Sequence, residues 1–354
     1  MSKLSVAVVG LNMGRAHLQT YEQLPEYKLV AICDINEELA KETSAKYGNV
    51  PYYLNYEEML AKAKPDVVCI VTPTALHCEM TLQAINAGVK GVYCDKPIAV
   101  NMAEARLMEK AAKEKDIPVV IGHQRRVSAP YTAMRSAITD GLIGDVYLIR
   151  GICAGDILSD GTHTVDSLMY LNGDCDISWV AGQIFRGPKA GAEEKAKNPY
   201  AYVGTRFGHN VERSAMASFQ MSNGVRCEIL CGDQLIMPGR FYQDIEVFGT
   251  KGRLWRNNDS SSPPVSINTT GEWKELPATD ITGINDSGLF NAHRYFAQTI
   301  LEGTPHLMSL EISMKGFEAV MAIYESARTN TIIFPPLQQD EYPLDVLLRE
   351  RGDI

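Results

Sequence analysis

The residue whose type and position most directly suggest chemistry is Lys96. It follows a short apolar run that begins at Gly91, and it stands between Asp95 and a proline. The preceding chain predicts a parallel sheet, and an ammonium group at the carboxyl edge of such a sheet points into the crevice where ligands bind. There it can hydrogen-bond a reacting oxygen or exchange a proton with it. The alternative is a solvated surface lysine after a strand.

A glycine turn follows the first apolar run, which ends at Val9. Of the dinucleotide spacing Gly-x-Gly-x-x-Gly it retains Gly10 and Gly14, with Asn12 in the second slot and one residue fewer overall. Asn tolerates a left-handed backbone, and the amides at the start of the following helix can face a pyrophosphate. We therefore assign Gly10, Asn12, Met13 and Gly14 to cofactor binding. A plain turn from strand to helix is the alternative.

Asp34 ends the second apolar run, 20 residues after Gly14. A carboxylate there accepts hydrogen bonds from the adenosine ribose and repels a 2′-phosphate. The next residues, Ile35 and Asn36, provide no cation for such a phosphate. The sequence thus favours NAD over NADP, although Asp34 could instead cap the helix that begins near Glu37.

A third segment with possible cofactor contacts leaves the apolar run that ends at Val71. Thr72, Pro73 and Thr74 predict a rigid turn, and His77 stands in the first turn of the next helix. His77 could contact a phosphate or a ribose, whereas a single histidine at such a place is more often structural.

Two halves of the chain show different patterns. The first 122 residues alternate apolar strands with helices, which predicts a parallel sheet covered on both faces. Beyond them, strand-like runs follow one another directly, and Ser222-Asn-Gly224 indicates a hairpin. We expect an α/β Rossmann domain over residues 1–123. An α+β domain with a large, mostly antiparallel open sheet is expected over 124–354, including the two closing helices.

Composition excludes several classes of function. The 354 residues carry a net charge of −9, which argues against nucleic-acid and anionic-membrane partners. No apolar run is long enough to span a bilayer. The eight cysteines are scattered without a Cys-x-x-Cys pair, so we expect reduced thiols in a cytoplasmic protein and no metal site.

Together these segments resemble the Gfo/Idh/MocA family of glucose–fructose oxidoreductase and inositol dehydrogenase. The resemblance spans nearly the whole chain. The family's Glu-Lys-Pro motif stands here as Asp95-Lys96-Pro97, and Gly122 to Arg126 resembles its segment ending in Asn-x-Arg, with Gln124 in the Asn place. The resemblance adds Asp95, Lys96, Gln124 and Arg126 to the expected cofactor contacts.

The resemblance implies hydride transfer between a sugar or polyol carbon and NAD. It assigns the base to His163, because an imidazole with a pKa of about 6.5 suits proton transfer near neutral pH. Lys96 would bind the same oxygen. The family commonly places Asp four residues before this histidine, whereas Ser159 stands there in this chain and Asp160 is three before it. Asp160 would orient His163 or bind a hydroxyl.

Other expectations follow from the same resemblance. The substrate contacts are Lys96 and His163 with Asp156, Thr162 and His209, and the chain forms a homodimer or homotetramer through the sheet of the second domain. Two other functions remain open: an NAD-using glycoside hydrolase or sugar-modifying enzyme, and a non-catalytic dinucleotide sensor. The sensor is disfavoured because it need not keep both Lys96 and His163.

Overall fold

The chain divides into two compact units in a computed structural model that describes residues 3–233, 235, 243–258, 262–278 and 288–354. One unit combines Met1–Val127 with Ser287–Ser313, and the other combines Ser128–Asp286 with Met314–Ile354. From the sequence we expected both closing helices in the second domain. The structure instead groups the first of them, α9 (Gly288–Glu302), with the N-terminal unit.

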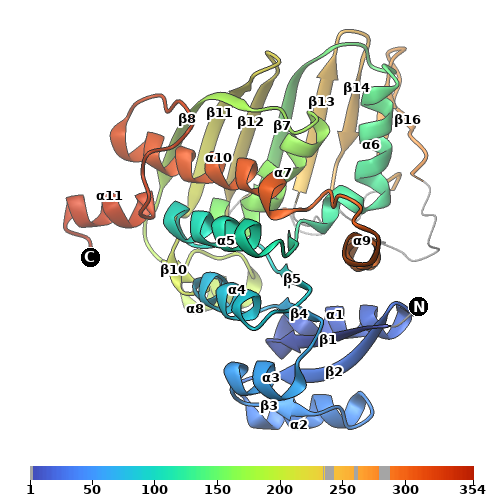
Figure 1. The fold of residues 1–354 in the computed structure, drawn as a ribbon. Helices are drawn as coiled ribbons and strands as arrows, with labels where there is room; N and C mark the ends of the chain where they lie inside the picture. The colour runs from blue at the N-terminus through green and yellow to red at the C-terminus, as the bar shows by residue number, and fades with distance from the viewer. Residues whose placement is uncertain (1–2, 234, 236–242, 259–261, 279–287) are drawn as a thin grey trace. The chain divides into compact units, whose positions relative to one another are not determined.

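The first unit contains a six-stranded, wholly parallel sheet in the order β3-β2-β1-β4-β5-β6 (Figure 1). Its central strands are buried on both faces, as their uninterrupted apolar runs predict. The order reverses between β1 and β4, so the carboxyl ends of these two strands border the crevice in which such sheets bind ligands. The strands are β1 (Leu4–Val9), β2 (Tyr27–Cys33), β3 (Tyr52–Tyr53), β4 (Val67–Ile70), β5 (Gly91–Cys94) and β6 (Val119–Ile121).

Helices connect these strands, and the sequence periodicity predicted most of them. The helix α3 and the short strand β3 were not predicted. The helices are α1 (Leu11–Gln23), α2 (Glu37–Lys46), α3 (Tyr56–Ala63), η1 (Thr74–Leu76), α4 (His77–Asn86), α5 (Met102–Lys115) and η2 (Gln124–Val127).

Helix α9 joins the first unit through a buried polar cluster. His293 places Nε2 2.9 Å from Nδ1 of His17 on α1, and Nδ1 3.0 Å from the Tyr21 hydroxyl. The Tyr27 hydroxyl donates to the His293 carbonyl oxygen, and Phe296 is fully buried in the same core. Burial lowers the pKa of His293 well below its usual value. The neutral ring makes both of these bonds to α1, and the His293 carbonyl accepts from β2, so this late segment is tied to the first 33 residues.

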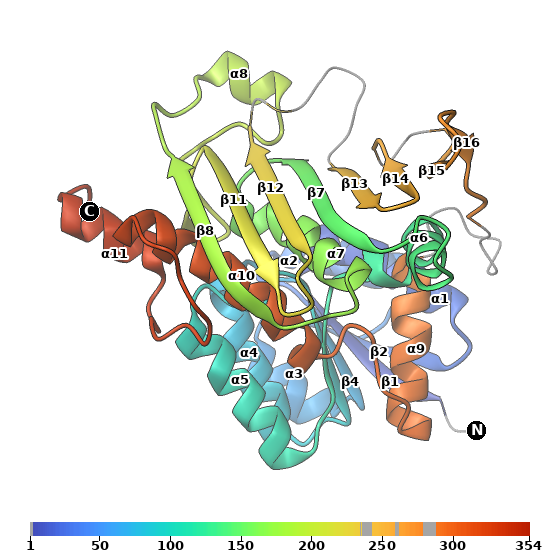
Figure 2. The ribbon, with the colours of Figure 1, turned by 90° about the horizontal axis from the view of Figure 1, so that it is seen from above.

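The second unit contains an eight-stranded sheet in the order β16-β15-β14-β13-β7-β12-β11-β8 (Figure 2). Strands β7 and β12 are parallel to each other, and every other pair of neighbouring strands in this sheet is antiparallel. This confirms the expected open, mostly antiparallel sheet. The predicted hairpin at Ser222–Gly224 joins β11 to β12. The strands are β7 (Val146–Ala154), β8 (Ile177–Phe185), β11 (Ser214–Met221), β12 (Arg226–Gly232), β13 (Gln243–Gly249), β14 (Gly252–Arg256), β15 (Ser266–Asn268) and β16 (Lys274–Glu275).

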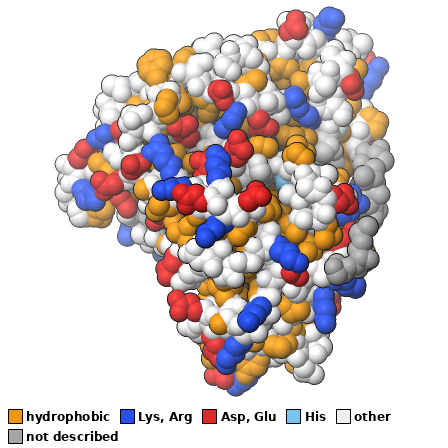
Figure 3. Space-filling model, in the orientation of Figure 1, with side chains coloured by type: hydrophobic (Ala, Val, Ile, Leu, Met, Phe, Trp, Pro, Cys, Tyr) orange, Lys and Arg blue, Asp and Glu red, His pale blue; other side chains and the backbone are white. Residues whose placement is uncertain are grey.

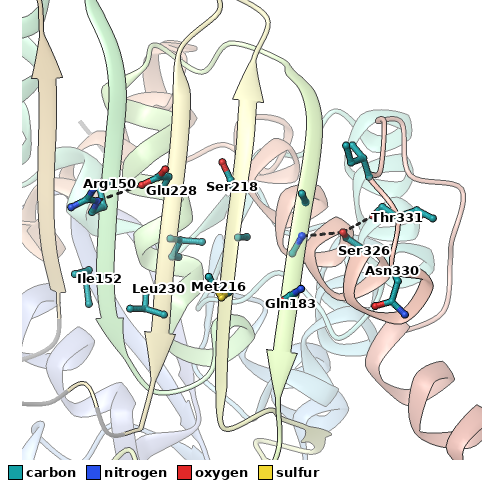
Figure 4. A pocket seen from close by; sticks show the side chains of 15 residues that line it. Arg150, Ile152, Gln183, Met216, Ser218, Glu228, Leu230, Ser326, Asn330 and Thr331 are labelled. Carbon is teal, nitrogen blue, oxygen red and sulfur yellow. Dashed lines mark hydrogen bonds and ion pairs between the residues drawn. The ribbon is translucent and has the colours of Figure 1, made fainter.

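The two faces of this sheet differ. One face is buried, and Gly151 of β7 lies against Thr164 of α7. The other face presents Arg150, Met216 and Leu230 in a groove of about 840 Å³ (Figure 4). The remaining elements of this unit are α6 (Ala129–Thr139), η3 (Ile157–Gly161), α7 (Thr162–Leu171), α8 (Ala192–Lys197), β9 (Thr205–Arg206), β10 (His209–Asn210), α10 (Leu310–Thr329, which begins in the first unit) and α11 (Pro343–Arg351).

The described residues also show how the charged side chains and the cysteines are distributed. Acidic and basic side chains are interspersed on the face drawn in Figure 3. All eight cysteines lie in the described residues, where they are free thiols, and seven of them are buried. In the described part of the chain, every helix is too short or too polar to cross a bilayer.

Candidate active site

The glycine turn between β1 and α1 has a backbone that requires glycine. Gly10 has a φ of 86°, and a Cβ atom there would collide with the carbonyl oxygen of Val71 at the end of the neighbouring β4. Helix α1 starts directly at Leu11, because Gly10, with its positive φ, completes the turn by itself. Asn12 and Met13 are exposed in the first turn of α1. A bare helix start beside a tight glycine turn fits a pyrophosphate.

Asp34 lies at the end of β2 and bonds to this turn. Its Oδ2 accepts from the Leu11 amide at 2.7 Å, and its Oδ1 accepts from the Asn36 amide at 2.8 Å. The cap of α2 is Asn36, whose side chain accepts from the Leu39 amide. Asp34 therefore does not cap that helix. Each carboxylate oxygen has a second lone pair, so both can still accept from ribose hydroxyls.

His77 connects the loops that follow β4 and β5. The ring is buried, with Nδ1 2.7 Å from the Pro97 carbonyl oxygen and Nε2 2.9 Å from the Thr72 carbonyl oxygen. Burial lowers the pKa of His77, although both carbonyls and Asp95 favour the charged ring. Both ring nitrogens thus face main-chain oxygens, and a direct contact of His77 with a cofactor stays a prediction.

The Asp95-Lys96 step follows β5 at the same edge of the sheet. The Lys96 amide donates to Oδ1 of its neighbour Asp95 at 2.8 Å. The Asp95 carboxylate lies close over Gly122, where a Cβ atom would be 2.6 Å from Oδ1. Gln124 and Arg126 come next, in η2 after β6, with Arg126 almost fully buried.

The cofactor contacts predicted within residues 1–127 therefore all lie at the carboxyl edge of the sheet in the first unit. The turns after β1, β2, β4, β5 and β6 carry them in order. Because parallel strands all end at one edge, residues far apart in sequence converge there. The residues are Gly10, Asn12, Met13, Gly14, Asp34, Thr72, Pro73, Thr74, His77, Asp95, Lys96, Gln124 and Arg126.

A π-helical turn in the second unit carries the predicted acids. Strand β7 ends at Ala154, Gly155 turns the chain with a φ of 80°, and Asp156 caps η3 by accepting from the Ser159 amide at 2.6 Å. Asp160 lies in η3, and its carboxylate fills the space that a side chain at position 155 would need. Helix α7 then begins with Thr162 and His163, both buried. π-Helical turns occur often at functional sites.

Arg206 is a site residue that the sequence analysis did not find. Its Nη1 lies 2.5 Å from Oδ2 of Asp160 and 3.2 Å from Oδ2 of Asp156. The three side chains are 18%, 8% and 2% exposed, so this is a buried cation shared by two carboxylates. The sequence contains only a weak sign of this residue. Arg206 stands beside the glycine turn at Gly208, and the two strands that flank this turn, β9 and β10, have two residues each.

His209 reaches the same turn from the β9–β10 hairpin. Its Nε2 lies 3.4 Å from Oγ of Ser159, and its Nδ1 lies 2.9 Å from the Asn210 carbonyl oxygen. The second unit therefore brings together Asp156, Asp160 and His209, while their contacts with a substrate stay predictions.

Comparison with known proteins finds a family match for the first unit and similar enzymes over more of the chain. Residues 4–123 match the family model of the NAD-binding Rossmann-fold oxidoreductases. The chain is 26% identical over 250 residues to the D-glucoside 3-dehydrogenase of Escherichia coli (63% of this chain, 68% of the relative). It is 23% identical over 285 residues to the myo-inositol 2-dehydrogenase of Thermotoga maritima (76% and 80%).

Solved structures share the fold over almost the whole chain. An oxidoreductase from Agrobacterium radiobacter, in complex with NAD⁺, L-tartaric acid and magnesium, superposes with a TM-score of 0.78 at 18% identity. The match covers 94% of this chain and 98% of that one. Residues 4–123 thus match the NAD-binding Rossmann domain of the Gfo/Idh/MocA oxidoreductase family, and the chain as a whole is similar to sugar and polyol dehydrogenases.

Proposed function

We propose that this protein is a dehydrogenase that uses NAD to oxidise a CH–OH carbon of a sugar, polyol or cyclitol, or runs the reverse reduction. The observation that carries the proposal is the grouping of Gly10, Asp34 and Lys96 at the carboxyl edge of one parallel sheet. A cation beside a nucleotide-binding turn suits a reaction in which an alcohol oxygen gains negative charge. The glucoside and inositol dehydrogenases among the relatives support a polyhydroxylated substrate.

The residues of the first unit fit the cofactor. Bound NAD supplies a nicotinamide ring that accepts or donates a hydride. Gly10 leaves no room for a side chain against Val71, so the turn can approach a pyrophosphate closely. Asp34 accepts hydrogen bonds from the adenosine ribose, and its negative charge, which repels a 2′-phosphate, makes NAD preferred over NADP. The other cofactor contacts that we propose are Asn12, Met13, Gly14, Thr72, Pro73, Thr74, His77, Asp95, Lys96, Gln124 and Arg126.

We assign the transfer of the substrate's hydroxyl proton to His163 and the binding of the alcohol oxygen to Lys96. In the oxidation, a ring nitrogen of His163 takes the hydroxyl proton as the carbon gives up its hydride. The Lys96 ammonium hydrogen-bonds the oxygen and stabilises the charge that develops on it. Asp160 orients the reacting groups, and Asp156, Thr162 and His209 bind neighbouring hydroxyls.

We also propose a homodimer or homotetramer that packs through the open face of the second unit's sheet. Met216 and Leu230 are 57% and 38% exposed there, and apolar groups gathered on one face favour association. Eight free cysteines support a cytoplasmic location, because cytoplasmic thiols are kept reduced.

A substrate panel tests the reaction. The purified protein is incubated with NAD or NADP and with cyclitols, aldoses and glucosides, while the absorbance of reduced nicotinamide is followed. Net accumulation of NADH with one of these classes is the expected result. Cleavage of a glycoside without any accumulation would indicate the sugar-modifying alternative, and the absence of both reactions would contradict the proposal.

A further inference from the structure

The π-helical turn that carries Asp156 and Asp160 depends on a carboxyl group outside it. The first amide of η3, that of Ile157, has no acceptor inside the turn, because the amides at the start of a helix have no partner there. It donates to Oε1 of Glu212 at 2.5 Å. Glu212 lies between β10 and β11 and is 1% exposed. A buried amide without an acceptor is costly, so this bond holds the start of the turn in place.

The second oxygen of Glu212 joins the turn to the rest of the unit. Oε2 accepts from the hydroxyl of Tyr324 on α10 at 2.5 Å. The Tyr324 ring packs edge-on against Tyr342, whose hydroxyl donates to the Asn210 carbonyl oxygen of the hairpin that carries His209. One buried network thus supports both the acid turn and the hairpin.

The charges around Glu212 favour its neutral form. Asp156, Tyr324, Tyr342 and Cys231 interact with it, and none of these four is a cation. Arg206 is already shared by Asp156 and Asp160. An ionised Glu212 would add a third carboxylate to a buried cluster that holds one guanidinium, which is unfavourable. Burial, and after it Asp156, raises the pKa of Glu212 to about 7, although the hydrogen bonds from Tyr324 and the Ile157 amide favour the ionised form.

We propose that Glu212 is a positioning residue: its carboxyl group holds the turn that presents Asp156 and Asp160 through the Ile157 amide, and loss of its proton loosens that turn by placing a buried negative charge against Asp156. The inference rests on the proposed function, because it assigns a task to the turn in the same reaction. Glu212 itself does not touch the substrate in this assignment.

The test compares Glu212→Gln with a matched control, Glu318→Gln. Glutamine keeps an acceptor for the Ile157 amide and cannot ionise; its NH2 group cannot accept from the Tyr324 hydroxyl, so that bond reverses and the amide donates to the hydroxyl oxygen. Glu318 has a similar structural task in the same unit, since its Oε1 accepts from the Leu337 amide. The measurement is kcat/KM of all three proteins across the pH range around neutrality.

We expect wild type and Glu212→Gln to agree at acid pH. Above the pKa of Glu212 the variant should exceed wild type severalfold, and Glu318→Gln should follow wild type throughout. Tyr324→Phe removes a bond that lowers the pKa of Glu212, so it should move the wild-type inflection to higher pH. A ratio of Glu212→Gln to wild type that stays constant with pH overturns the proposal, as does the same change in Glu318→Gln.

A readout without substrate separates the two proposals. Thermal unfolding of wild type and Glu212→Gln at the same pH values reports the titration of Glu212 directly. If the protein oxidises none of the substrates but the difference between the two melting temperatures changes as the pH rises from about 4.3 to about 7, the proposed reaction fails while the buried titration stands. If that difference does not depend on pH, the role of Glu212 is refuted even in an active enzyme. If Glu212→Gln does not fold, the inflection of Tyr324→Phe decides.

Discussion

Lys96 gains its significance from its main-chain surroundings as much as from its charge. Asp95 accepts its amide, Gly122 leaves room for the Asp95 carboxylate, and His77 bonds the carbonyl of the next residue, Pro97. These contacts fix the main chain from which the long, flexible side chain extends. A lysine held in this way suits a positioned ammonium better than a solvated surface group.

Replacement of Lys96 by alanine should lower turnover much more than NAD affinity. Loss of a group that stabilises a developing oxyanion costs on the order of 10²–10³ in kcat. Steady-state kinetics with NAD titration by fluorescence measure both quantities. Lys90→Ala is the control, since Lys90 is an exposed lysine of the same unit paired with Asp66. Normal turnover in Lys96→Ala would remove this lysine from the mechanism.

Asp34 should determine the choice between NAD and NADP. Asp34→Ala removes the carboxylate that repels a 2′-phosphate, so the ratio of kcat/KM for NAD to that for NADP should fall. The variant also loses the acceptor of the Leu11 and Asn36 amides, which lowers stability. Asn36→Ala controls for this loss, because removal of a helix cap costs about 1 kcal/mol and should leave selectivity unchanged. Unchanged selectivity in Asp34→Ala would reduce Asp34 to a structural role.

At the scale of elements, His77 makes the loops after β4 and β5 one structure. His77→Leu removes the ring between the carbonyl oxygens of Thr72 and Pro97, and the one that accepts its N–H loses its donor, at a cost of about 1–3 kcal/mol. Turnover should fall with stability, because the Pro97 carbonyl adjoins Lys96.

His306→Leu is the matched control for His77, since it removes a buried histidine of the same unit that bonds the Ala292 carbonyl oxygen. Chemical denaturation and kcat are measured on both variants. If both lose stability equally and both keep full turnover, His77 does not position Lys96.

The acid turn should make stability depend on pH through Glu212. Its pKa of about 7 in the folded protein lies above the unfolded value of about 4.3, so the folded state binds the extra proton between these values. The stabilisation is complete below about pH 4.3 and is lost as the pH rises to about 7, by at most about 4 kcal/mol. Glu212→Gln should therefore gain stability relative to wild type over this window in urea unfolding. If the unfolding free energies of the two proteins change in parallel with pH, this prediction is contradicted.

At the scale of the whole molecule, the open sheet face should be an interface between copies of this chain. Met216→Asp with Leu230→Asp introduces charges in the middle of the groove and should lower the mass seen in sedimentation, with unchanged circular dichroism. Leu142→Asp, at another exposed apolar residue of the same unit, should keep the wild-type mass. A wild-type protein that sediments as a monomer would refute the assembly.

The sequence by itself determined the two sheets and the residues at the edge of the first one. Apolar runs bounded by turn residues report strands locally, and parallel strands must end together, so Asp34 and Lys96 could be grouped without coordinates. Strands of two or three residues, such as those flanking Gly208, are too short to show a period, and the sequence analysis did not predict them.

Only the tertiary structure decided which distant partners complete these elements. His293 bonds His17 across 276 residues, which moves α9 into the first unit. Arg206 pairs with Asp160 across 46 residues, and Glu212 accepts the Ile157 amide across 55. An amphipathic or charged segment shows that it needs a partner, but its pattern does not say which one. Chain topology makes that choice, because it determines which buried charge lies beside which amide or counter-ion.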